Sequence, residues 1–229
     1  MIYPQRTCFI SSWMNIAPRT AVLALSRKPA RTSLLRLRSQ QSGEALYHVR
    51  PLQRKEYGRF AAVCAECFFD ANINSDTFRS RRLRVEILIS QWLRSLSSRQ
   101  LESYAIFAKD TGKVCGVVEV TVDHISDGSL LAYLFAGPLC AYIQNLAVVA
   151  SERRKGLASR LMLQCECRAR KWGYDEIFLH VVHDNHAAIK FYRTQGYQII
   201  RRDPLWKRYL GLTPLVLFRK LLSEDLQCD

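Results

Sequence analysis

The residues with the clearest chemical potential lie between positions 142 and 159, where a basic turn containing a glycine joins two apolar segments. The first segment ends in Leu146-Ala147-Val148, and the second begins with Arg153-Arg154-Lys155-Gly156-Leu157-Ala158-Ser159. A strand, a basic turn and the first turn of a helix direct backbone N–H groups and the positive end of the helix dipole toward one point, where an anion binds. Gly156 has no Cβ, so the backbone there can approach a phosphate closely. The segment predicts a phosphate site that is not a Walker A loop, because no Gly-Lys-Ser/Thr follows. A solvated basic loop is the alternative.

Two strands and two helices are expected to position this turn. The ranges 141–149 and 176–183 are apolar at nearly every position, which is typical of strands covered on both faces. Helical spacing of apolar residues predicts helices over 156–172 and 185–195. Further strands are expected at 45–51, 104–109, 114–123, 197–202 and 214–220, and further helical segments at 55–69 and 77–96. This order predicts an α+β (α/β layered) fold around a mixed sheet.

The composition limits the class of protein. The chain has 229 residues, of which 48% are hydrophobic, so it can form one domain with a buried core and is not globally disordered. No apolar run reaches the roughly 18–20 residues that span a bilayer, so no membrane partner is expected. Cys64 and Cys67 form a Cys-x-x-Cys in a helical run, and no second Cys-x-x-Cys or His pair completes a zinc set, so no metal site is expected.

The charge is strongly positive and unevenly distributed. There are 34 Lys and Arg against 20 Asp and Glu, which gives a net charge of +14. Seven of the cations and none of the acids lie in the first 43 residues, so residues 44–229 carry 14 − 7 = +7. An acid-free leader rich in Arg and Ser predicts an organelle transit peptide at 1–43, ahead of a single domain at 44–229. The Ser and Thr content favours the plastid stroma, with the mitochondrion as second choice, and a basic tail that stays attached is the alternative.

Two sets of residues resemble the GNAT superfamily of N-acetyltransferases. Arg153-x-x-Gly156-x-Ala158 fits the family's acetyl-CoA motif, and the run Leu179-His180-Val181, Asn185, Ala188, Phe191-Tyr192 and Gly196-Tyr197 is similar to its second half. The resemblance covers about residues 45–220 and, with the leader, is greatest to the plastid-targeted GNAT proteins of plants and algae. It implies the GNAT fold, a mixed and mostly antiparallel sheet of six to seven strands flanked by about four helices.

The resemblance also implies where acetyl-CoA lies. Backbone groups of the strand Leu146-Ala147-Val148 pair with the pantetheine arm, as an added strand would. The motif that begins at Arg153 holds the diphosphate through the N–H groups of Arg154–Ser159, a run that includes Lys155, Gly156, Leu157 and Ala158. Asn185 binds the arm from the next helix. The strand that ends near Val149 and the strand around His180 are expected to separate, so that donor and acceptor meet between them.

The implied reaction is direct acetyl transfer to an amine in a ternary complex. Tyr192 matches the family's usual general acid, and a core tyrosine is the alternative. His180 is the candidate general base because an imidazole titrates near neutrality, although a hydrogen-bonded core histidine fits equally well. Glu119 is the rival base or a lining residue, and Asn145 is a candidate for positioning water or the acceptor.

Three functions remain open on the sequence alone. The first is acetylation of protein α-amino termini, and of lysine ε-amines, in the plastid. The second is acetylation of small amines such as serotonin. The third is a non-catalytic basic module that binds nucleic acid or a ribosome surface. Two groups of cations favour it, the helical residues Arg79, Arg81, Arg82 and Arg84 and the later residues Arg201, Arg202, Lys207 and Arg208. Nucleic acid is the least expected partner, because the phosphates of CoA already account for part of the positive charge. The sequence gives no indication of the oligomeric state.

Overall fold

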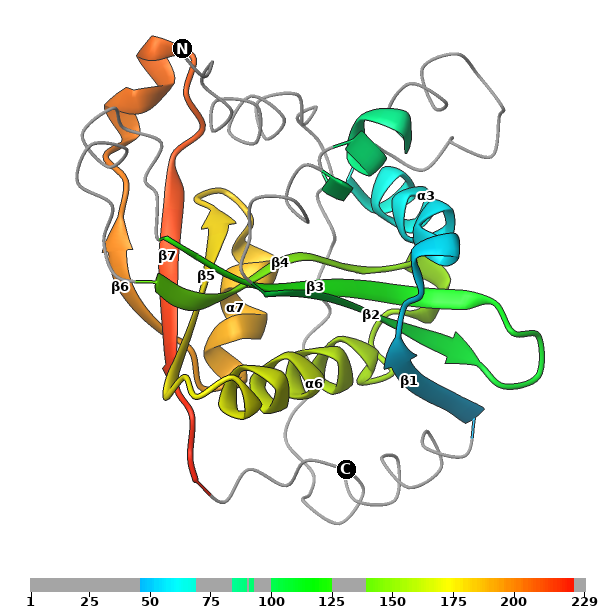
Figure 1. The fold of residues 1–229 in the computed structure, drawn as a ribbon. Coiled ribbons are helices and arrows are strands. Elements are labelled where there is room, and N and C mark those ends of the chain that lie inside the picture. Colours follow the sequence, from blue (N-terminus) through cyan, green and yellow to red (C-terminus); the bar gives the residue numbers. More distant parts are fainter. Residues whose placement is uncertain (1–45, 69–83, 90, 93–99, 125–138, 225–229) are drawn as a thin grey trace, which may run out of the picture.

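The computed structural model describes residues 46–68, 84–89, 91–92, 100–124 and 139–224. Seven strands form one sheet in the order β1-β2-β3-β4-β5-β7-β6 (Figure 1). Only β4 and β5 run parallel, and every other neighbouring pair is antiparallel. The expected mixed and mostly antiparallel sheet is therefore confirmed. The strands are β1 (Tyr47–Pro51), β2 (Leu101–Ala108), β3 (Val114–His124), β4 (Leu139–Val148), β5 (Glu176–Val182), β6 (Gln198–Arg202) and β7 (Leu215–Leu221).

Helices cover both faces of this sheet. The α-helices are α3 (Tyr57–Phe68), α6 (Leu157–Lys171) and α7 (His186–Thr194), and the 3-10 turns are η2 (Arg54–Glu56), η3 (Ala150–Glu152) and η4 (Leu205–Leu210). Residues 84–89 and 91–92 are also helical, within the basic stretch expected at 77–96. The predicted leader at 1–43 and the segment 125–138 lie outside the described residues. None of the helices in the described ranges is long and apolar enough to cross a lipid bilayer.

The alternation of β3 separates two apolar clusters. Val118 and Val120 pack in the cluster that contains the side chains of α6 and α7, whereas Val117 packs in the cluster that contains those of α3. Because successive residues of a strand point to opposite faces, α3 lies on one side of the sheet and α6 and α7 lie on the other (Figure 1). Leu161 of α6 is fully buried, and burial of such a side chain contributes roughly 1.5–3 kcal/mol.

A β-bulge interrupts β4 next to β3. Val117 pairs with Ala147 and Glu119 pairs with Gln144, so two residues of β4 lie opposite the single residue Val118. Asn145, in the bulge, has a positive φ of 57°, a conformation that Asn tolerates better than most residues. Beyond the bulge the two strands approach closely, since a Cβ on Gly116 would lie 2.9 Å from the carbonyl oxygen of Ala147.

The bulge is accompanied by a separation of β4 from β5. These parallel strands pair only at Ala141–Ile177 and Tyr142–Phe178, near the start of each strand. Beyond those pairs the strands share no further ladder, so the sheet is open between the second half of β4 and the second half of β5. This is the separation that the family resemblance implies.

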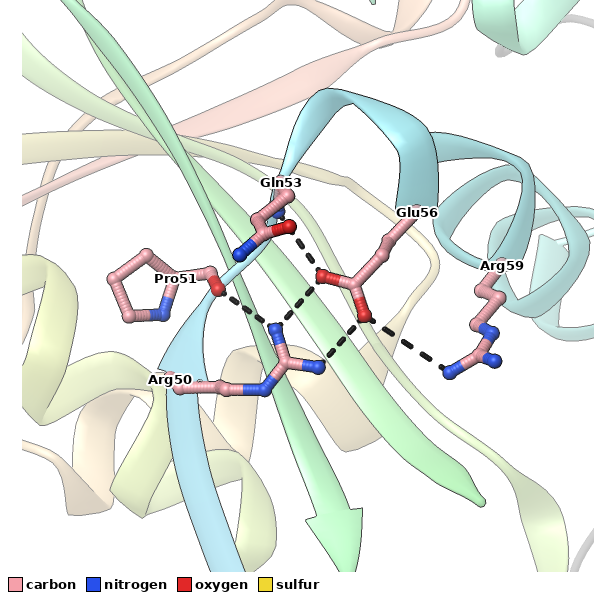
Figure 2. A network of polar contacts seen from close by, with 5 residues as sticks. All are labelled: Arg50, Pro51, Gln53, Glu56 and Arg59. Atoms are coloured by element: carbon pink, nitrogen blue, oxygen red, sulfur yellow. Dashed lines mark hydrogen bonds and ion pairs between the residues drawn. The ribbon is translucent and has the colours of Figure 1, made fainter. Parts of the chain in front are cut away.

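An ion-pair network fixes the start of α3 to the end of β1. Figure 2 shows the guanidinium of Arg50 bound through both terminal nitrogens to the carboxylate of Glu56, at 2.7 Å and 2.6 Å. The same carboxylate accepts the backbone N–H of Gln53 at 3.1 Å, and Arg59 approaches it to 3.9 Å. The Arg50 contact, together with the Gln53 N–H, lowers the pKa of Glu56 to about 2, so the pair stays ionised at neutral pH. The network therefore fixes α3 over its face of the sheet.

Candidate functional site

The basic turn between β4 and α6 has the geometry of an anion cradle. After η3 the chain passes through Arg154 (φ 65°) and Gly156 (φ 78°), and α6 begins at Leu157. The backbone N–H groups of Arg154–Ser159 donate to no backbone carbonyl of the described residues. A Cβ built on Gly156 meets no atom within 4 Å, so the space above the turn is open. Unpaired donors at a helix N-terminus are suited to bind an anion, and the phosphate site at this segment stays a prediction.

The side chains around the turn fix its position against the sheet. Arg153 donates from Nε to the carbonyl oxygen of Val148 at 3.0 Å, which holds this cation along the end of β4. Leu157 is 2% exposed and packs in the α6 cluster, so its side chain anchors the helix and only its backbone can contact a ligand. Ala158 and Ser159 are half-buried. In the predicted acetyl-CoA motif, the exposed residues are Arg153, Arg154, Lys155 and Gly156.

Asn185 and Tyr192 lie on α7. Asn185 is the N-cap of α7, and its side-chain oxygen accepts the backbone N–H of Ala188 at 3.0 Å. Capping uses one acceptor position of that oxygen and leaves both hydrogens of the amide nitrogen for a ligand. Tyr192 lies on the inner side of α7, with its ring 5.9 Å from the rings of Tyr197 and Phe218. Burial raises the pKa of Tyr192, so the phenol keeps its proton at neutral pH.

The two candidate bases project from the opposite face. Phe178 of β5 packs with Tyr142, Cys140 and Leu217, away from the α6 and α7 cluster, and His180 follows two residues later on that same face. Glu119 of β3 is fully buried and has the same strand parity as Val117, which packs with α3. Tyr192 therefore lies on one face of the sheet, and Glu119 and His180 lie on the other, near the opening between β4 and β5.

Each candidate base has a defined hydrogen-bond partner. Asn145 donates from Nδ2 to Oε2 of Glu119 at 2.9 Å, because the bulge turns Asn145 toward β3. The hydroxyl of Tyr142 lies 2.8 Å from Nδ1 of His180 and also accepts the backbone N–H of His180 at 3.1 Å. Burial raises the pKa of Tyr142, so it remains a neutral partner of the imidazole.

Tyr142 is the site residue that the sequence does not reveal. It lies in an apolar strand, where a tyrosine is expected to belong to the core. Only the pairing of Tyr142 with Phe178 across the parallel strands brings its hydroxyl to His180. Tyr142 and His180 are 38 residues apart in the chain, so no local sequence pattern connects them.

Comparisons with known proteins show the family and the fold. Residues 68–197 match the model of the acetyltransferase (GNAT) family. The chain is 30% identical to GCN5-related N-acetyltransferase 10, chloroplastic, of Arabidopsis thaliana, over 92% of this chain and 85% of that protein. It is 28% identical to N-alpha-acetyltransferase 60 of Xenopus tropicalis, over 46% of this chain and 47% of that protein. The PaiA N-acetyltransferase of Thermoplasma acidophilum, solved with coenzyme A, has a similar fold, with a TM-score of 0.54, 18% identity and coverage of 76% and 98%.

The strained backbone of Arg154 gives the first prediction. A non-glycine residue at a φ of 65° costs about 1 kcal/mol, and glycine removes that cost. We expect Arg154→Gly to unfold about 2–4 °C higher than Arg154→Ala, which removes the same charge but keeps the Cβ. Thermal unfolding measured by calorimetry compares the two variants, and equal melting temperatures would contradict the left-handed conformation.

Proposed function

The chain belongs to the GNAT family of acetyltransferases, and we propose that it transfers the acetyl group of acetyl-CoA to protein α-amino groups, and to lysine ε-amines, by direct transfer. Acetyl-CoA is the acetyl donor of this family. The observation that carries the proposal is the opening between β4 and β5, which has a buried tyrosine on one side and a hydrogen-bonded histidine and carboxylate on the other. A donor and an acceptor that enter from opposite faces can meet in such an opening.

The donor is held by the basic turn and the free side of β4. The N–H groups of Arg154–Ser159 bind the diphosphate, and the backbone of Leu146, Ala147 and Val148 contacts the pantetheine arm. Asn185 adds a contact from α7 through its amide nitrogen. Support comes from the N–H groups that lack backbone acceptors, the open space above Gly156 and the end of the β4–β5 ladder at Tyr142.

The acceptor amine must lose a proton before it attacks, because a lysine ammonium has a pKa near 10.4 and an α-ammonium one near 7.7–8.0. We assign this step to His180, directly or through water. The role requires the tautomer in which Nδ1–H donates to the Tyr142 oxygen 2.8 Å away, which orients the ring and leaves the lone pair on Nε2. Glu119 is the alternative base, in which case Asn145 orients the carboxylate.

The remaining steps balance the protons. The amine nitrogen forms a bond to the acetyl carbonyl carbon, and a backbone N–H of the Leu146–Val148 strand stabilises the oxyanion. The carbon–sulfur bond then breaks, and the phenol of Tyr192 gives its proton to the departing thiolate. The phenol of Tyr192 is protonated at neutral pH and so has a proton to give, although burial, which raises its pKa, makes it a weaker acid than an exposed tyrosine. The nitrogen releases its second proton to water as the amide forms. After the products leave, solvent returns a proton to Tyr192 and removes the one held by His180.

An exposed apolar surface on η4 favours a polypeptide acceptor over a small amine. Trp206 is 56% exposed and Tyr209 is 92% exposed, and Leu205, Leu210 and Leu212 are exposed beside them. The cations of the same segment pair with carboxylates of the fold. Lys207 pairs with Asp203 at 3.1 Å, and Arg208 pairs with Asp184 at 2.5 Å. The η4 segment is therefore tied to the residue before Asn185 and presents a neutral apolar surface beside the donor site.

The same ion pairs weaken the case for a nucleic-acid partner. Lys207 and Arg208 belong to the basic set that favours such a partner on sequence, but each has a carboxylate partner within the fold. Paired cations contribute less to phosphate binding than free ones, because the internal carboxylate competes for them. The pairing therefore lowers the support for a nucleic-acid-binding module mainly at Lys207, whose side chain is 20% exposed, and less at Arg208, whose pair with Asp184 is exposed.

We also propose that the protein acts in the plastid. The support is the acid-free basic leader at 1–43 and the chloroplastic relative that matches most of the chain. A fluorescent protein fused after the full chain is expected to colocalise with chlorophyll in plant cells. Removal of residues 1–43 is expected to leave the fluorescence in the cytosol, and cytosolic signal from the full-length fusion would contradict the plastid location.

The acceptor class is tested by mass spectrometry. Purified full chain with acetyl-CoA is expected to acetylate the α-amines of peptides, with a preference for bulky apolar first residues over acidic ones, and to leave serotonin and phenethylamine almost unmodified. Trp206→Ala and Tyr209→Ala should each raise the KM for apolar peptides about 5- to 30-fold, as loss of a buried apolar contact does. Leu221→Ala, an exposed apolar residue at the other end of β7, is the control and should leave KM unchanged. Rapid acetylation of the small amines with slow acetylation of every peptide would overturn the proposed acceptor.

The acid role of Tyr192 is tested by Tyr192→Phe, which keeps the ring in the core and removes only the proton. We expect kcat to fall by about 10²-fold, while the Kd for CoA measured by calorimetry stays within about 2-fold of wild type. Gly156→Glu is the contrasting variant. It places a carboxylate in the open space above the turn and is expected to abolish CoA binding. Unchanged kcat in Tyr192→Phe would remove the acid role and leave the donor site intact.

A further inference from the structure

Lys155, the third cation of the basic turn, already has an internal carboxylate partner. Its ammonium lies 2.8 Å from Oε2 of Glu152 and donates to the hydroxyl oxygen of Tyr47 at 3.2 Å. The Tyr47 hydroxyl in turn donates to the same Glu152 oxygen at 2.6 Å. The three groups form a closed triangle that joins β1, η3 and the turn.

The members of this triangle are not equally fixed. Tyr47 is buried in the core cluster, and Arg160 donates to its backbone oxygen at 3.2 Å. Glu152 is anchored by the Tyr47 hydroxyl, and its side chain is only 22% exposed. The Lys155 side chain is 47% exposed and has a long flexible stem. Lys155 is therefore the member that can leave, while Tyr47 holds Glu152 in place.

Glu152 lies where it can compete with a bound diphosphate for the ammonium of Lys155. Arg153, Arg154 and Lys155 supply three positive charges, and Glu152 removes one, so the local charge is 3 − 1 = +2. A diphosphate bound at the turn is a second anion within reach of the same ammonium. An exposed ammonium exchanges readily between two anions in water, because each exposed ion pair is weak.

We propose that Glu152 sets the affinity of the turn for the phosphates of CoA by competing with them for Lys155. In the empty protein Lys155 binds Glu152, and on binding of CoA it moves to the diphosphate. This inference rests on the proposed donor site, and it adds a residue that contacts neither the donor nor the acceptor. Its consequence is faster release of CoA, because substrate and product carry the same phosphates and Glu152 weakens both complexes.

If Glu152 competes with CoA for Lys155, the effects of substituting Glu152 and Lys155 on the Kd for CoA depend on each other. Direct repulsion between Glu152 and the phosphates predicts no such dependence. In the wild-type background, Glu152→Gln frees Lys155 and is expected to tighten CoA binding about three- to ten-fold, with stronger product inhibition by CoA. Lys155→Met is expected to weaken CoA binding by a similar factor. In the Lys155→Met background, Glu152→Gln is expected to change the Kd less than two-fold, because there is no ammonium to release.

Calorimetric titration of the full chain with CoA and with dephospho-CoA measures all four members of this cycle. Dephospho-CoA keeps the diphosphate and is expected to show the same coupling. Glu56→Gln is the charge-matched control, since it also removes one carboxylate from an ion pair but lies in η2, and it should leave both affinities unchanged. Thermal unfolding of each variant checks that the fold is intact.

Three results would overturn the inference. Equal tightening by Glu152→Gln in both backgrounds would indicate direct repulsion of the phosphates, without exchange of Lys155. No tightening in the wild-type background, or no weakening by Lys155→Met, would mean that Lys155 stays with Glu152. Each of these results still requires CoA to bind, whereas a folded wild-type chain that binds no CoA would overturn the proposed function itself.

Discussion

The bulge in β4 is the constraint on which the site depends. Without the additional residue at Asn145, β4 would keep its alternation and could continue its ladder with β5, as parallel neighbours ordinarily do. With it, the ladder ends at Tyr142 and the second half of β4 leaves its β5 side unpaired. The same residue places the Asn145 amide on Glu119, so one irregularity both opens the sheet and orients a carboxylate beside the opening.

The opening also explains why the candidate acid and bases come from different faces. A sheet normally isolates its two faces, and here α6 and α7 cover one while α3 covers part of the other. Tyr192 is buried among aromatic rings on the first face, where it has no reason to lose its proton. His180 lies on the second face, held by a neutral tyrosine that imposes no charge on the imidazole. The candidate acid and the candidate bases thus lie on opposite faces of the sheet, and the opening between β4 and β5 is the place where the two faces connect.

The local pattern of the sequence predicts the elements well and their tertiary consequences poorly. Alternation in 114–123, two-faced apolar strands at 141–149 and 176–183, and Gly156 at the start of a helix are local features, and the structure has each element within a few residues of its expected range. The bulge at Asn145 cannot be predicted from the sequence, because an Asn in a strand does not indicate that two residues of β4 lie opposite one residue of β3. The Tyr142–His180 contact depends on the register between strands 38 residues apart, which no periodicity encodes.

The sequence also does not predict which cations are paired with carboxylates in the fold. The sequence counts Arg153, Arg154 and Lys155 as equal cations, and Lys207 and Arg208 as a basic tail. In the fold, Lys155 contacts Glu152 and Tyr47, and the η4 cations Lys207 and Arg208 pair with Asp203 and Asp184. The effective charge of a segment is set by which carboxylates the fold brings within about 4 Å, because the Coulomb energy of a pair falls with distance and with exposure to water. At η4, Asp203 and Asp184 offset the charges of Lys207 and Arg208, and the exposed side chains beside them are apolar. At the basic turn between β4 and α6, Lys155 is paired with Glu152. Two of the carboxylates responsible, Glu152 and Asp184, lie in short connections outside the motif. Glu152 comes directly before Arg153, and Asp184 comes directly before Asn185.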